Sequence, residues 1–237
     1  MKDVTPDLLE KIKTSFYAGI DNSLEVKRVA KLIENGSATY ATAHDYASEL
    51  GKILMKAFSD NLSADVLPDG RMYYNIAKRI MESMLGRDHH LVANFASQVQ
   101  ELLNAKAGFG LKAIKVPMNE SRVAGFIERL SSAESFDEIS WILGEPVRNF
   151  SQSIVEEVIK ANADFHANAG MKPTIKRTVV GGCCDWCRQL AGTYPYEEVK
   201  RTGHPVFMRH QHCDCLVTYD PGDSRRQNVH TKRWLTP

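Results

Sequence analysis

The sequence predicts a mostly α protein, in which a helical scaffold is followed by a small α+β module at the C-terminus. Apolar residues recur at helical spacing through residues 1–170, whereas short runs rich in β-branched residues appear after Gly170. In addition, all five cysteines lie between Cys183 and Cys215. We therefore divide the chain into a helical domain at residues 1–170 and a Cys/His module with a basic tail at residues 171–237.

The first helices are marked by capping residues and apolar stripes. Thr5-Pro6-Asp7 is typical of a helix start, because threonine can cap, proline suits the first turn and aspartate suits the positive end of the helix dipole. A second helix is expected to end near Asn35-Gly36 and a third to begin near Thr42. Gly86 resembles a C-cap that separates two further stripes. The stripes contain Leu8, Ile12, Phe16, Val29, Leu32, Tyr46, Leu50, Leu54, Phe58, Met72, Ile76, Ile80, Met84, Leu91, Phe95, Val99 and Leu103.

The second half of the helical region begins after a connector that contains Gly108, Gly110 and Pro117. Asn119 is expected to cap the next helix, which bears Val123, Phe126, Ile127 and Leu130. A short segment at residues 136–143 follows. Pro146 then opens the longest predicted helix, which ends at Gly170 and turns Val147, Phe150, Ile154, Val158 and Phe165 inward.

The C-terminal module has the pattern of short strands joined by turns. Residues 174–180 and 216–219 are predicted strands, and Gly181-Gly182 predicts a tight turn. The cysteines would then lie on the turns between strands, in a zinc-knuckle-like arrangement. A metal would stabilise a module whose own core is too small to do so.

Composition limits the class of protein. The chain has 237 residues, 43% of them hydrophobic, which suffices for an ordinary packed core. Neither a membrane span nor a signal peptide is expected, because no apolar run approaches about 18 residues and the chain starts Met1-Lys2-Asp3. We therefore expect the protein in the cytosol, where reducing conditions favour free or metal-bound thiols over disulfides.

The cysteines and neighbouring histidines have the spacing of a zinc site. Cys184-x-x-Cys187 is a two-thiolate bite, and a second group of donors follows at His210, His212, Cys213 and Cys215. A closed tetrahedral zinc site needs four such ligands. The sequence predicts one structural Zn²⁺ per chain, bound by Cys184, Cys187 and two donors of the second group. The sequence leaves that pair open, and Cys183 would be a neighbour that tunes or replaces a ligand.

Other interpretations of these residues stay open. The cysteines could be reduced, buried and without metal, or Cys184-Asp185-Trp186-Cys187 could be a redox dithiol. A metal-dependent nuclease could use His212 as a base, with Asn228 and His230 holding a metal. Thiolate-rich sites are normally closed and weakly Lewis acidic, which favours a structural role and no catalytic residues. The sequence also contains neither a phosphate-binding glycine loop nor a serine nucleophile elbow.

Charge is distributed unevenly along the chain. Residues 171–237 contain 11 Lys and Arg against 6 Asp and Glu, whereas residues 1–170 contain 19 against 23. The basic end could contact nucleic acid, could dock on the module, or could be solvated charge. The candidate contact residues are Arg225, Arg226, Lys232, Arg233 and Trp234.

Four sequence stretches resemble the C-terminal module of minor head proteins from tailed phages and prophages of Gram-positive bacteria. They are CCDWC at residues 183–187, LAGTY at 190–194, RHQHCDC at 209–215 and QNVHTK at 227–232. A fainter likeness extends to LPDG at 67–70 and NFSQS at 149–153. The chain is also distantly similar to MuF-type head-morphogenesis proteins, which pair a helical region with a His/Cys-x-Cys module. It departs from that pattern at Cys183-Cys184 and at His212, which leaves the ligand set open.

The resemblance implies a structural minor capsid protein of the virion. Such a protein is associated with the portal or the major capsid protein, acts in head morphogenesis or in DNA packaging and delivery, and takes any oligomeric symmetry from the head. Its expected location is the head interior or the portal region, and the host cytoplasm during assembly. The alternatives are a nuclease or toxin carried with the head, and a zinc-bearing interaction adaptor.

Overall fold

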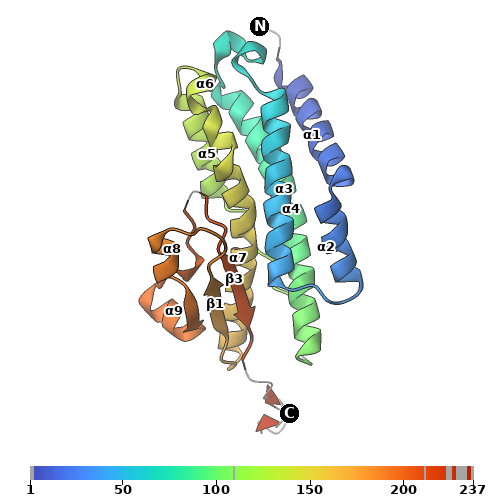
Figure 1. The fold of residues 1–237 in the computed structure, drawn as a ribbon. Coiled ribbons are helices and arrows are strands. Elements are labelled where there is room, and N and C mark those ends of the chain that lie inside the picture. The colour runs from blue at the N-terminus through green and yellow to red at the C-terminus, as the bar shows by residue number, and fades with distance from the viewer. Residues whose placement is uncertain (1–2, 109, 211, 223–225, 228–233, 236–237) are drawn as a thin grey trace.

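The computed structural model is mostly helical, with a small antiparallel sheet near its C-terminal end (Figure 1). It describes residues 3–108, 110–210, 212–222, 226–227 and 234–235. Across that part of the chain, no helix is long and apolar enough to cross a membrane. The longer helices are α1 (Thr5–Asn22), α2 (Leu24–Glu34), α3 (Tyr40–Asn61), α4 (Tyr74–Lys106), α5 (Glu120–Ser132) and α7 (Glu145–Asn168).

Helix α3 lies at the centre of the bundle and contacts α1, α2, α4 and α7, while α4 also packs on α5 and α7. The short elements α6 (Phe136–Ile139) and η3 (Ser140–Leu143) lead into α7, and η1 (Ala64–Val66) and η2 (Pro68–Gly70) lead into α4. Helices α3 and α7 come very close at Gly51, where a Cβ atom would lie 2.7 Å from the Cα of Arg148. Glycine at this position therefore lets the two helices that support the sheet pack together.

The sheet has the strand order β2-β1-β3, with β1 (Thr174–Thr178) antiparallel to both neighbours. Helix α8 (Asp185–Gln189) precedes β2 (Gly192–Pro195), and α9 (Tyr196–Thr202) and η4 (Pro205–Phe207) lie between β2 and β3 (Leu216–Asp220). Strand β3 contacts both α3 and α7, and α9 contacts α7 (Figure 1). Beyond the sheet, β4 (Arg226–Gln227) pairs with β5 (Trp234–Leu235).

The hydrophobic core runs without interruption from the helices into the sheet. Ile175 and Val217 on the inner face of the sheet are fully buried in the same cluster as the residues of α3 and α7. Burial of apolar surface at this boundary contributes to stability on both sides, at about 25 cal/mol per Å². The predicted division at residue 170 marks the change from helices to sheet, and the packing joins the two regions.

Several predicted boundaries were wrong. The stripes on either side of Gly86 belong to one helix, α4, because an isolated glycine is tolerated inside a helix that packs along its whole length. Helix α1 starts at Thr5 as predicted, but its N-cap is Val4 and not Thr5. Helix α3 starts at Tyr40, two residues before the predicted Thr42, after Thr39, whose backbone N–H binds the Thr42 hydroxyl at 3.2 Å. The first strand ends at Thr178. Asn119 caps α5 as predicted, by accepting from the Arg122 N–H at 3.1 Å.

Candidate metal centre

The donor side chains come from two segments that the sheet brings together. Cys184 is the N-cap of α8, and Cys187 lies within that helix. The sequence had predicted that this pair lies on a turn between strands, and that prediction was wrong. His210 and Cys213 lie in the connection between η4 and β3, and Cys215 immediately precedes β3. Pairing of β1 with β3 places this connection opposite the residues that follow β1.

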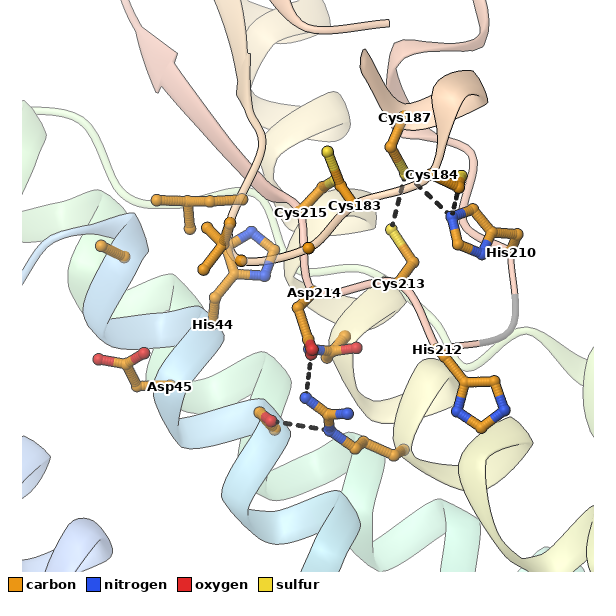
Figure 2. A pocket seen from close by; sticks show the side chains of 18 residues that line it. His44, Asp45, Cys183, Cys184, Cys187, His210, His212, Cys213, Asp214 and Cys215 are labelled. Carbon is orange, nitrogen blue, oxygen red and sulfur yellow. Dashed lines mark hydrogen bonds and ion pairs between the residues drawn. The ribbon is translucent and has the colours of Figure 1, made fainter.

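The donor atoms face one another (Figure 2). The Nε2 atom of His210 lies 2.9 Å from the Cys187 sulfur and 3.3 Å from the Cys184 sulfur, and the Cys187 and Cys213 sulfurs are 3.7 Å apart. Among the described residues, Cys184, Cys187 and His210 form one group that could hold a metal ion, and Cys187, Cys213 and Cys215 form another. Five of the six candidate donors therefore gather in one cluster whose two groups share Cys187.

These separations suit a tetrahedral zinc site. With Zn–S bonds of about 2.3 Å and Zn–N bonds of about 2.0 Å, ligand atoms lie about 3.8 Å apart for two sulfurs and about 3.5 Å apart for sulfur and nitrogen. The Cys187–Cys213 separation matches the first value, and the Cys184–His210 separation is within a few tenths of an ångström of the second. The Cys187–His210 separation of 2.9 Å is shorter than the second value. The residues present thus fit a zinc ion once these two side chains move apart by about 0.6 Å.

Arg177 is a buried cation directed at the sulfurs. Its side chain is 1% exposed, and its Nη2 atom lies 3.4 Å from the Cys213 sulfur and 3.8 Å from the Cys187 sulfur. The other end of the guanidinium donates to the carbonyls of Val206 and Met208. Burial opposes the charge, but the thiols of the cluster and the Glu156 carboxylate raise the pKa of Arg177.

The charge of the buried Arg177 also limits how many metal ions the cluster can hold. A zinc ion with three thiolates and one neutral imidazole carries one net negative charge, which one guanidinium would neutralise. A second divalent ion would add two positive charges beside Arg177 and would be repelled. The electrostatics therefore favour a single ion. Burial meanwhile raises the pKa of Cys187, whereas a bound cation would favour its ionised form.

Replacing Arg177 by methionine is expected to weaken zinc binding by about 10–100-fold while leaving one zinc per chain at saturation. The substitution removes the compensating charge and leaves two carbonyls without their donor. Affinity is measured by competition with a coloured chelator. Lys176→Met is the matched control, because Lys176 is the exposed neighbour on the same strand. Equal affinities of the two variants would contradict the role assigned to Arg177.

Arg209 fixes the segment that carries Cys213 and Cys215. It donates to the carbonyls of both cysteines at 2.8 Å. It is itself held by Glu156 of α7, at 2.8 Å, in an ion pair in which both side chains are 3% exposed. Burial raises the pKa of Glu156, and Arg209 opposes that shift. The donor segment is thereby tied to the longest helix of the C-terminal half.

His44 of α3 supports the same segment from the other side. Its Nε2 atom lies 2.9 Å from the Val217 carbonyl, and its Nδ1 atom lies 3.3 Å from Arg209. The carbonyl needs a donor, so Nε2 carries the proton and Nδ1 accepts from Arg209. Burial, together with the Arg209 charge, lowers the pKa of His44 to about 3, and the ring is neutral. His44 is therefore a structural contact between α3 and β3.

A cleft of about 500 Å³ opens beside the sulfurs, between α3, the first turns of α7 and the cysteine segments. Arg148 lies on its wall and binds Glu145, Ser48 and Asp214. His212 lies apart from the cluster in Figure 2, with its side chain 67% exposed and its Nδ1 atom 3.7 Å from Glu145. His212 is thus outside both donor groups.

The structure describes two of the five residues predicted to contact nucleic acid or a partner. Arg226 and Trp234 belong to the paired strands β4 and β5. Arg225, Lys232 and Arg233 lie outside the described residues, as do Asn228 and His230 of the nuclease interpretation. Contact of the basic tail with nucleic acid or a partner therefore stays a prediction.

Neither models of protein families nor curated or solved proteins matched this chain. The interpretation of the site therefore depends on its residues and their geometry. Three residues that support the donors, Arg177, Arg209 and His44, were not predicted from the sequence. Arg177 could have been found, because strand alternation places it on the same face as the buried Ile175. Arg209 and His44 gave no such signal, because their roles arise from contacts between distant segments.

Proposed function

We propose that this chain is a structural minor head protein of a tailed phage, with one structural zinc ion in its C-terminal region. The observation that carries the zinc centre is the convergence of thiols and an imidazole around Cys187, backed by the buried guanidinium of Arg177. A donor set closed in this way leaves no position for a reacting water, which supports a structural role for the ion. The phage assignment is supported by the sequence resemblance at residues 183–194 and 209–232.

The contacts around the centre suit a docking scaffold. The donor segment is joined to α7 by Arg209 and Glu156, by Arg148 and Asp214, and by Asn149, whose side chain donates to the His210 carbonyl at 3.0 Å. An ion that holds this segment would therefore fix the sheet against the helices. A rigid body of this kind can present surfaces to the portal or to the major capsid protein inside the head.

Co-expression with the portal and major capsid proteins of the same phage tests this proposal. We expect the chain to copurify with one of them and to be found in assembled heads, with about one zinc per chain by elemental mass spectrometry. Purified protein should leave DNA and RNA uncut, and His212→Ala should not change the copurification. Cleavage that is lost in a folded His212→Ala variant would instead support the nuclease alternative, and copurification with host proteins in place of head proteins would support an adaptor.

A further inference from the structure

The candidate metal centre offers more donors than one zinc ion uses. Tetrahedral zinc takes four ligands, whereas Cys184, Cys187, His210, Cys213 and Cys215 supply five donor atoms. Cys187 belongs to both groups of neighbouring donors, and His210 lies nearest to it. Three four-ligand sets can be drawn around Cys187 and His210, one for each pair of the remaining thiols, and each set joins members of both groups.

The five donors differ sharply in exposure. Cys187, Cys213 and Cys215 are 1%, 1% and 2% exposed, whereas Cys184 is exposed. Arg177 contacts the buried side of the cluster, at Cys187 and Cys213. The Cys184 sulfur is thus open to molecules in solution. Cys187, Cys213 and Cys215 line the adjoining cleft as Cys184 does, but their side chains present almost no surface.

The donors also differ in how firmly the backbone holds them. Arg209 binds the carbonyls of Cys213 and Cys215 and fixes both residues to α7. Cys184, by contrast, follows the turn at Gly181-Gly182, at which an added Cβ would meet no atom within 4 Å. It also begins a helix of five residues. Rotation of the Cys184 side chain between rotamers would therefore disturb little of the packed structure.

We infer that Cys184 is an exchangeable ligand and a modification site for soft electrophiles and thiophilic cations. When Cys184 leaves, Cys187, His210, Cys213 and Cys215 retain the zinc. In reaction with a haloacetamide, the Cys184 sulfur forms a bond to carbon and displaces the halide, and the thiol proton passes to water. This inference rests on the zinc centre of the proposed function.

The test uses the zinc-loaded full chain in a Cys183→Ser background, which removes the neighbouring thiol that lies outside both donor groups. Iodoacetamide is added while a coloured chelator reports released zinc, and mass spectrometry locates the carbamidomethyl group. We expect modification at Cys184 with about one zinc per chain retained. Adding Cys184→Ser to this background should lower zinc affinity by less than about 100-fold, whereas adding Cys187→Ser should abolish binding.

The outcomes separate the inference from the centre on which it rests. If the Cys183→Ser protein binds zinc and the Cys183→Ser/Cys184→Ser protein does not, Cys184 is an essential ligand. That result would contradict the inference that Cys184 is exchangeable and would still support the zinc centre. Release of one zinc ion for each modified Cys184 would also contradict the exchange and support the zinc centre. Absence of zinc from both the native chain and the Cys183→Ser protein would overturn the centre and the inference together.

Discussion

Replacing Cys187 by serine is expected to remove the metal and to loosen the sheet region, while the helices α1 to α4 stay folded. Cys187 is common to both donor groups, lies 2.9 Å from His210 and is buried against Cys213. Serine is a poor zinc ligand and places a hydroxyl among buried sulfurs. Structural zinc in small peptides contributes roughly 10–16 kcal/mol of apparent binding free energy at neutral pH, more than a three-stranded sheet can replace.

Elemental mass spectrometry, thermal unfolding and limited proteolysis measure this outcome. Zinc should fall from about one per chain to near zero, and protease cleavage should appear within residues 171–222. Helical circular dichroism should persist, although at a lower melting temperature, because Ile175 and Val217 belong to the helical core. Cys183→Ser is the matched control and should keep its zinc. Unchanged melting and metal content in Cys187→Ser would remove the zinc hypothesis.

The sequence predicted those parts of the fold that depend on local chemistry. Pro146 and Gly170 mark the ends of α7, because proline suits a first turn and Gly170 adopts a φ of +85°. The predicted helix end at Gly86 was wrong, because the continuity of α4 depends on contacts with distant segments. Packing against α3, α5 and α7 outweighs the local preference of one glycine, and nothing in the residues nearby reveals that packing.

At the metal centre, too, the sequence predicted the local features and not the contacts between distant segments. Spacing narrowed the candidate donors to six residues, because two closely spaced pairs of ligands are a local property of the sequence. It did not exclude His212, which the fold places outside both donor groups. The partners that hold the donors come from elsewhere: Arg177 is on β1, and Glu156, which holds Arg209, is on α7. A buried ion pair between distant segments leaves no spacing pattern, so its members look like ordinary surface charges until the fold is known.

Replacing Asp88 by asparagine is expected to stabilise the protein at alkaline pH and to have little effect in acid. Asp88 lies within α4 and is fully buried, with one carboxylate oxygen 2.8 Å from the Ser151 hydroxyl and the other without a partner among the described residues. Burial raises the pKa of Asp88 from 3.8 to about 7, although the hydrogen bond from Ser151 opposes the shift. The folded protein therefore holds a proton that the unfolded chain releases.

The hydrogen-bond geometry supports the protonated form. The Ser151 hydroxyl also lies 3.2 Å from the Val147 carbonyl, and a hydroxyl has a single proton to donate. A protonated Asp88 can donate to Ser151, which can then donate to Val147, so that neither acceptor is left unpaired. The amide of asparagine can make the same donation without ever ionising.

The sign and the pH window follow from the raised pKa. Between about pH 4 and pH 7 the folded state binds more protons than the unfolded state, so the contribution of Asp88 to stability is full below pH 4 and is lost as the pH rises through 7. The loss is on the order of 4 kcal/mol for a shift of this size. Urea unfolding of the native chain, Asp88→Asn and the exposed control Asp21→Asn at several pH values measures it. The free energy of unfolding of Asp88→Asn should exceed that of the native chain by an amount that grows from pH 5 to pH 8. If this difference instead stays constant with pH, Asp88 is ionised in the folded protein and the prediction is wrong.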